Sequence, residues 1–250
     1  MRVFCVVQYK GTKYYGWERQ IGQISVEEEI ENALSKIFNQ EINIFGSGRT
    51  DAGVHALGQT FHFDVDENKY DKFDLMYRLN CILPEDINIE EVTYLEEGSD
   101  FHARYSAKRK VYEYRLSQNA KNPFRYDQCW MIARANFDTK LLELGMEKFL
   151  GKHNFINFTS KEEDNDGFIR EIYEIKWGFD EENREIGIRI EGNGFMRYQI
   201  RYIVGTLVAV ATRKVDLDYI DEKLNNTEHR SITAYKAPAH GLYLMEVKYK

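Results

Sequence analysis

The sequence predicts an α+β fold made of two ferredoxin-like (βαββαβ) halves. Three observations predict it: strand and helix patterns follow one another in the order β-α-β-β-α-β, a similar order returns later, and 250 residues with 14% aromatic side chains suffice for a large core. We expect the halves, residues 1–103 and 104–250, to join into one extended mixed or antiparallel sheet with helices on one face. The other face would then form a broad concave cleft for a large, charged ligand.

The first half is defined by local patterns. Residues 2–9 alternate as a strand does, and Ser25 with Glu28 forms a capping box that opens a helix. The elements expected after that helix are a short strand with Ile42 and Ile44, a strand over 59–65, a helix over 73–81 that ends before Pro84, and a strand over 87–94.

The second half repeats the order without visible sequence identity to the first. Asp138 is a good helix N-cap, and Gly151 is expected to close the same helix. The predicted elements are a strand over 110–117, a helix over 138–150, strands over 167–178 and 184–191, a buried helix over 195–212, a short helix over 217–225 and a closing strand over 241–249.

Composition excludes several classes of protein. The three cysteines, Cys5, Cys81 and Cys129, are odd in number and widely spaced, so we expect neither a disulfide framework nor a zinc site. We expect the chain to act in a reducing cytoplasm. No run approaches the roughly 20 apolar residues of a membrane span. The amino terminus has the pattern of a strand and not of a signal peptide.

The charge distribution points to a polyanionic ligand more than the total charge does. A formal net charge of −7 argues against a nucleic-acid partner. Residues 104–115, however, hold five basic residues, one acid and three interleaved tyrosines. Salt screens distant charges over about 8 Å, so a local basic groove can still bind phosphates. The candidates there are Arg104, Lys108, Arg109 and Lys110; a solvated edge strand guarded by basic residues is the alternative.

A second candidate region is the segment 46–56, with three glycines in eight residues. Glycine allows backbone angles and close approaches that side chains forbid, so this segment can present Asp51 and Arg49 into a cleft. The alternative is an Asx-type turn in which Asp51 only bonds its own backbone. The local residues leave both open.

Residues 48–56, Gly-Arg-Thr-Asp-Ala-Gly-Val-His-Ala, resemble the signature of the TruA family of tRNA pseudouridine synthases. Further blocks resemble that family in its own order, namely residues 9–20, 100–107, 195–204 and 241–244. The resemblance therefore covers essentially the whole chain.

The resemblance implies roles for single residues. Asp51, in the first half, is implied as the catalytic carboxylate, and Arg201, on a helix of the second half, as the arginine that pairs with it. Tyr112 is the implied substrate-facing tyrosine, and Leu242 would pack against the target base. Arg49 could then fill the space left by the extruded base or grip a flanking phosphate.

The implied reaction turns uridine into pseudouridine in the anticodon stem-loop of tRNA, at tRNA positions 38–40. It needs no metal and no organic cofactor, and the family implies a homodimer without membrane attachment. Two alternatives stay open: the same chemistry on ribosomal RNA, and a catalytically silent RNA-binding module.

The residues alone leave the chemical role of Asp51 open. It could attack C1′ or C6 as a nucleophile or remove a ribose proton as a base. Each role needs an ionised carboxylate, and a neighbouring arginine such as Arg201 would keep it so. The alternative is that Arg197 and Arg201, four residues apart, merely edge the core.

The chain departs from the family pattern at several places. The family usually has Asp where Lys10 stands and Gln where Glu18 stands, and often has histidine within 197–199. The segment 157–168 is more acidic than we expect beside RNA. His55, His62 and Trp17 are interpreted as structural residues.

Overall fold

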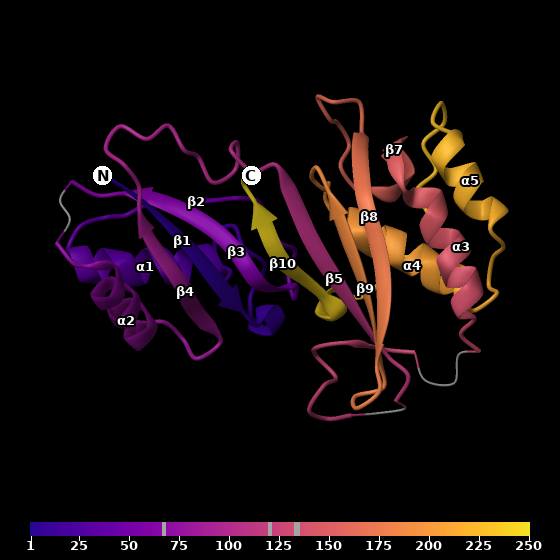
Figure 1. The fold of residues 1–250 in the computed structure, drawn as a ribbon, viewed down its shortest axis with the longest axis horizontal. Coiled ribbons are helices and arrows are strands. Elements are labelled where there is room, and N and C mark those ends of the chain that lie inside the picture. The colour runs from indigo at the N-terminus through magenta and orange to yellow at the C-terminus, as the bar shows by residue number, and fades with distance from the viewer. Residues whose placement is uncertain (67–68, 120–121, 133–135) are drawn as a thin grey trace. The chain divides into compact units, whose positions relative to one another are not determined.

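The computed structural model describes residues 1–66, 69–119, 122–132 and 136–250, and its strands and helices confirm the α+β class (Figure 1). The chain forms two compact units, one of Met1–Lys108 with Tyr243–Lys250 and one of Arg109–Leu242. The predicted halves meet at 103/104, whereas the compact units divide at 108/109. The last strand pairs with a strand of the first unit, and all of its residues after Leu242 belong to that unit.

The sheet of the first unit has the strand order of a ferredoxin-like fold. Strand β1 lies between β4 and β3, antiparallel to both, while β2 and β10 pair with β3 near its end and its start. The elements are β1 (Arg2–Tyr9), α1 (Val26–Phe38), β2 (Phe45–Gly46), β3 (His55–Asp64), α2 (Lys72–Ile82), β4 (Ile87–Tyr94) and β10 (Leu242–Lys248), with a 3-10 turn at Gly11–Lys13.

Helices α1 and α2 cover one face of this sheet (Figure 1). Alternate residues of β1 and β3 point into that face, where Phe61 and Phe63 are fully buried. Ser25 accepts a hydrogen bond from the Glu28 N–H, which confirms the predicted N-cap of α1. Phe38 at the end of α1 meets Phe63 edge to face, with 6.2 Å between ring centroids.

The predicted strand around Ile42 and Ile44 is wrong. Both side chains are buried, but their backbone N–H groups donate to side chains of α1 and not to another strand: Ile42 to Ser35 Oγ at 3.2 Å and Ile44 to Glu31 Oε1 at 3.2 Å. Pairing with β3 starts only at Phe45. The segment is thus an extended connection tied to the helix.

The sheet of the second unit runs in the order β5-β9-β8-β7 with antiparallel neighbours, and β6 pairs parallel with β5. The elements are β5 (Arg109–Ser117), β6 (Trp130–Met131), α3 (Thr139–Phe149), β7 (Gly151–Asn154), β8 (Ile169–Asp180), β9 (Glu185–Gly192), α4 (Gln199–Ala211) and α5 (Asp218–Asn225), with 3-10 turns at Ile156–Phe158 and Ala239–Gly241.

Gly151 follows the C-cap of α3, so it closes the helix as predicted, and it also begins the next strand. Helix α3 ends at Phe149 with Leu150 as its C-cap, and Gly151 has a φ of +90°, a value that favours glycine. It turns the chain into β7, a strand that the sequence did not predict, where Gly151 pairs with Ile172.

Helix α4 forms the buried centre of the second unit's helical layer. It starts four residues into the apolar run, after Tyr198, and its residues from Ile203 to Ala211 are all buried. Glycines set its packing distances: a Cβ on Gly145 of α3 would lie 2.9 Å from Leu207, and one on Gly205 would lie 2.6 Å from the Tyr235 carbonyl oxygen. Within the described ranges, no helix is long and apolar enough to span a membrane.

Candidate active site

Asp51 lies in the connection between β2 and β3, and this connection is held by the amino-terminal segment 9–17. The Tyr9 hydroxyl shares a hydrogen bond with Thr50 Oγ1 at 2.8 Å, and the Trp17 N–H donates to the Thr50 carbonyl oxygen at 3.2 Å. The Gly53 N–H donates to the Tyr14 carbonyl oxygen at 3.2 Å. The first two sequence blocks of the family resemblance are therefore one structural element.

Glycine makes this contact possible. A Cβ on Gly11 would lie 1.9 Å from the Val54 carbonyl oxygen, and one on Gly16 would lie 2.5 Å from that of Thr50. Gly16 and Gly53 also have φ values of +98° and +78°, which disfavour other residues. The backbone of the amino-terminal segment thus lies in direct contact with the backbone before and after Asp51.

The other side of the Asp51 connection is fixed by buried polar groups. Ser47 Oγ donates to Gln59 Oε1 at 2.7 Å, and Gln59 Nε2 donates to the Gly48 carbonyl oxygen at 2.8 Å. Ser47 and Gln59 have no solvent exposure. Both ends of the connection are therefore anchored before any ligand binds.

The histidines and Trp17 are structural, as predicted. His55 is buried, accepts a hydrogen bond from the Gly11 N–H at Nδ1 (3.1 Å) and stacks on Tyr243 at 4.7 Å. His62 is buried and accepts from the Ala103 N–H at 3.2 Å, and burial lowers its pKa to about 4. Trp17 is 2% exposed.

Asp51 and Arg49 are both more exposed than Thr50, which lies between them. Thr50 and Val54 are buried, whereas Asp51 is half-buried and the Arg49 side chain is 69% exposed. Arg49 forms an ion pair with Glu18, one of the residues that departs from the family pattern. An RNA that uses Arg49 must therefore displace Glu18.

The predicted basic segment is divided between the two units. Arg104, over the Tyr105 ring at 5.9 Å, and Lys108, whose N–H donates to the Lys248 carbonyl oxygen, belong to the first unit. Arg109 and Lys110 begin β5 in the second unit, where Arg109 pairs with Glu191 at 3.2 Å. The structure therefore does not collect the four residues in one unit.

Tyr112 and Leu242 are both largely buried. Tyr112 on β5 is 8% exposed and meets Phe195 edge to face, with 5.4 Å between ring centroids. Leu242, at the start of β10, is 5% exposed. Lys110 is on the same face of β5 as Tyr112, because alternate residues of a strand share a face.

Arg201 lies on α4 in the second unit. The Arg201 Nε donates to the Ala237 carbonyl oxygen at 2.8 Å, and the Ala237 N–H donates to the Arg201 carbonyl oxygen at 2.9 Å. Tyr114 is close by: its hydroxyl donates to the Pro238 carbonyl oxygen at 2.8 Å. Burial raises the pKa of Tyr114 well above its ordinary value, and the positive charge of Arg201 opposes that shift.

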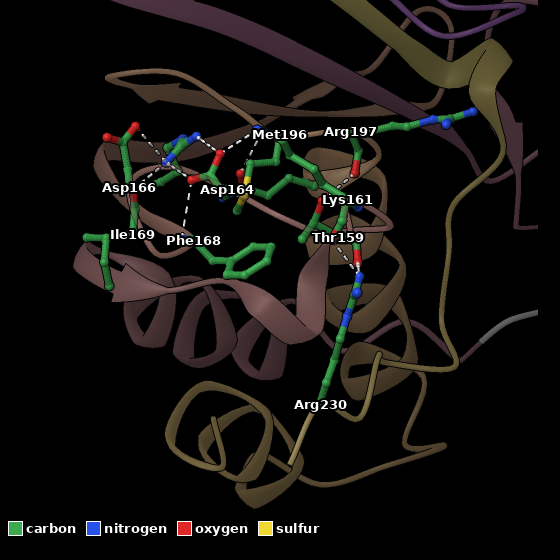
Figure 2. Close-up of polar contacts among 11 residues, drawn as sticks. Thr159, Lys161, Asp164, Asp166, Phe168, Ile169, Met196, Arg197 and Arg230 are labelled. Carbon is green, nitrogen blue, oxygen red and sulfur yellow. Dashed lines mark hydrogen bonds and ion pairs between the residues drawn. The ribbon is translucent and has the colours of Figure 1, made fainter. Parts of the chain in front are cut away.

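The acidic segment is folded around one buried carboxylate (Figure 2). The Asp164 side chain is 3% exposed and accepts hydrogen bonds from Lys161 Nζ at 2.6 Å and from both Nη groups of Arg170 at 3.0 and 3.1 Å. Burial alone would raise its pKa, but the bonds from Lys161 and Arg170 outweigh burial and lower the pKa to about 2. This acid serves the fold.

The same segment braces the turn that precedes α4 (Figure 2). Thr159 Oγ1 donates to the Arg197 carbonyl oxygen at 2.9 Å, and the Ser160 N–H donates to the same oxygen at 3.3 Å. Arg230 Nη2 in turn donates to the carbonyl oxygens of Thr159 and Lys161, both at 2.8 Å. The start of the Arg201 helix is thus tied to the acidic segment.

Sequence reasoning missed two residues beside Arg201. The guanidinium of Arg201 lies 5.0 Å from the ring centroid of Tyr198, and Lys236 lies over the same ring. The helical spacing of Tyr198 and Arg201 was a usable signal, but Lys236 is distant in sequence.

Among the described residues, no group of three or more His, Cys, Asp or Glu side chains could hold a metal ion.

Comparisons with known proteins match nearly the whole chain. A family model described as tRNA pseudouridine synthase matches residues 5–106 and 146–250. The tRNA pseudouridine synthase A of Dictyoglomus thermophilum is 38% identical over 245 residues, 97% of each chain. That of Exiguobacterium sibiricum is 36% identical over 250 residues, which are 100% of this chain and 97% of the relative.

One solved structure, "Crystal Structure of a Cbf5-Nop10-Gar1 Complex", is similar over 82% of this chain and 53% of its own chain. Its sequence identity is 12% and its TM-score 0.35, so it bears on no residue of the site.

The contact at Gly11 can be tested by adding one methyl group. We expect Gly11→Ala to destabilise the chain by about 1–3 kcal/mol, because the new Cβ would overlap the Val54 carbonyl and force the backbones apart. Gly178→Ala is the control, since a Cβ there would meet nothing within 4 Å. Urea denaturation measures both variants, and equal stabilities would contradict the close approach.

The Asp164 network makes stability depend on pH. Its pKa is about 2 in the folded chain and ordinarily 3.8, so its contribution is complete above about pH 4 and is lost as the pH falls towards 2. Asp164→Asn should cost about 2 kcal/mol at pH 7 and about half of that at pH 3. Asp166→Asn, at a side chain that is 76% exposed, should change little. A cost of Asp164→Asn that does not vary with pH would contradict this assignment.

Proposed function

The chain belongs to the tRNA pseudouridine synthase family, and from this premise we propose that it isomerises uridine in the anticodon stem-loop of tRNA with Asp51 as the catalytic carboxylate. The observation that supports this choice of residue is the anchoring of the Asp51 connection on both sides. Tyr9, Tyr14 and Trp17 hold one side, and Gln59 holds the other. A carboxylate on such a rigid support keeps its position against a bound substrate.

The reaction itself requires little besides a positioned carboxylate. The bond between N1 of uracil and C1′ of ribose breaks, the base turns, and C5 bonds to C1′. The C5 proton leaves and N1 gains a proton, so substrate and product have the same composition and redox state. Asp51 acts as a nucleophile at C1′ or C6 or as a base, and each route needs its ionised form.

Arg201 is the proposed partner of the Asp51 carboxylate. A nearby guanidinium favours the charged form of a carboxylate and can bond both of its oxygens. Support comes from the family match over the α4 segment and from the geometry of Arg201 within its own unit. The Ala237 carbonyl holds its Nε at 2.8 Å, so the direction of the guanidinium is set before substrate binds.

We propose that Tyr112 and Leu242 contact the uracil once it has left its stack, a step that costs about a few kcal/mol. Phe195 fixes the orientation of the Tyr112 ring. Stacking on a ring tolerates a base that turns in its own plane. The proposed phosphate contacts are Arg49, Arg104, Lys108, Arg109 and Lys110; Arg49 and Arg109 must first exchange Glu18 and Glu191 for phosphate.

The catalytic assignment is tested by tritium release from a tRNA transcript that carries 5-tritiated uridine. The unchanged chain should release tritium, and Asp51→Asn should lower the single-turnover rate by about 10³-fold or more while tRNA binding persists. Asp100→Asn, an exposed acid outside both anchored segments, is the matched control.

Three outcomes would contradict the assignment in different ways. An Asp51→Asn rate within tenfold of the unchanged chain would exclude Asp51 as the catalytic carboxylate. Release from ribosomal RNA but not from tRNA would exclude the proposed substrate. If the chain bound tRNA without releasing tritium, it would be an RNA-binding module and not an enzyme.

We also propose that the chain acts as a homodimer in the cytoplasm, on the support of the family resemblance. Light scattering of the purified chain should give about twice the 29.6 kDa mass of one copy. A monomer mass at micromolar concentration would contradict the dimer and leave the catalytic proposal untouched.

A further inference from the structure

Three cationic side chains converge on one tyrosine of the second unit. The guanidinium carbons of Arg197 and Arg201 lie 4.9 and 5.0 Å from the ring centroid of Tyr198, and Lys236 Nζ lies 4.7 Å from it. Lys236 Nζ is also 5.9 Å from the Tyr202 ring. The face of an aromatic ring attracts cations, so Tyr198 holds them together despite their mutual repulsion.

The cations of this cluster are close enough to act on one ligand. Because each lies about 5 Å from the same point, no two of them are more than about 10 Å apart. That separation is near the screening length of physiological salt, so their potentials add. A ligand with several negative charges would relieve the repulsion among them.

Arg197 and Lys236 are exposed and form no ion pair with an acid in the part of the chain that the structure describes. The polar contact of the Arg197 guanidinium is neutral, a hydrogen bond that Nη2 donates to the Tyr198 hydroxyl at 3.0 Å. Elsewhere in the same unit, Arg125 pairs with Glu185 and Arg213 with Asp138. Arg197 and Lys236 therefore keep positive charge that the fold neutralises at those other arginines.

The backbone beneath the cluster is fixed. Tyr198 has a φ of +64°, a conformation uncommon outside glycine. The Arg197 carbonyl oxygen is held by Thr159 and Ser160 of the acidic segment. Figure 2 shows the Arg197 side chain extending away from Asp164, whose charge is used by Lys161 and Arg170. Thr159 and Ser160 therefore brace the cluster, and Asp164 does not neutralise it.

We propose that Arg197 and Lys236, held around Tyr198 beside Arg201, bind two phosphates of the RNA backbone next to the reacting nucleotide. Each strand of a nucleic-acid duplex carries one charge per about 3.4 Å of helix axis, so neighbouring phosphates fit the span of the cluster. Three cations lie within 5.0 Å of the centroid of the Tyr198 ring, so the ring serves to hold charge and not as a platform for a base. The identity of the RNA rests on the proposed function.

The test compares the salt dependence of tRNA binding in two double variants of equal charge. R197A/K236A removes the two exposed cations. K140A/K214A removes two exposed lysines at the far end of α4, where Asp138 bonds the Ala211 carbonyl oxygen. A third variant, R197K/K236R, keeps both charges. Affinities for an unmodified tRNA transcript are measured between 50 and 200 mM salt.

Loss of two phosphate contacts should reduce the slope of log affinity against log salt by about 1.4–1.8. The loss of affinity across the stated salt range should therefore become about seven to twelve times smaller in R197A/K236A. K140A/K214A and R197K/K236R should keep the slope of the unchanged chain.

Other outcomes overturn the proposal. Equal slope changes in R197A/K236A and K140A/K214A would show an effect of net charge alone. If R197A/K236A kept the slope of the unchanged chain, the proposal that Arg197 and Lys236 contact phosphates would be excluded. Loss of binding to poly-L-glutamate with unchanged binding to tRNA would assign the cluster to an acidic protein. If the unchanged chain bound tRNA and released no tritium, the proposed function would be wrong. The salt dependence of tRNA binding would still test whether Arg197 and Lys236 contact phosphates.

Discussion

The close approach of two backbones, made possible by Gly11 and Gly16, is the constraint on which the first unit's candidate site depends. At these glycines the amino-terminal segment passes so near the Asp51 connection that a single added carbon would overlap a carbonyl group. Thr50 and Gly53 then bond to Tyr9, Trp17 and Tyr14, and Gln59 closes the other side. Asp51 is left half-buried in a connection that Thr50 and Val54 anchor in the core. This is the arrangement expected of a residue that must meet one atom of a substrate in a fixed geometry.

The second unit solves a different problem, which is how an acidic chain can present positive charge. The chain holds 41 acidic and 34 basic residues. Asp164 is turned inward onto Lys161 and Arg170, and the same segment ties down the start of α4. Arg197 and Lys236 beside Tyr198 are then exposed, and Arg197 lies on a braced turn. Of the acids in 157–168, which looked unfavourable beside RNA, Asp164 is thereby explained as internal bracing, whereas Glu162, Glu163 and Asp166 are exposed.

The sequence predicted what local patterns and the family resemblance could carry. The Ser25 cap, the alternation in β1 and the glycine-rich Asp51 segment are local signals, and all three correspond to structure. The alternation of Ile42 and Ile44 wrongly predicted a strand. Both side chains are buried, as in a strand, but their backbone N–H groups bond to Ser35 and Glu31 on a helix. Lys236 lies 38 residues from Tyr198, so only the folded chain could place it over that ring.

The central claim, that Asp51 serves pseudouridine formation in tRNA, is tested most directly by mapping pseudouridine in all RNA of a strain that lacks this chain. The account predicts that pseudouridine disappears from the 3′ side of tRNA anticodon stem-loops and nowhere else. It also predicts that the unchanged gene restores it and the Asp51→Asn gene does not. Unaltered tRNA in the deletion strain, or restoration by Asp51→Asn, would contradict the account.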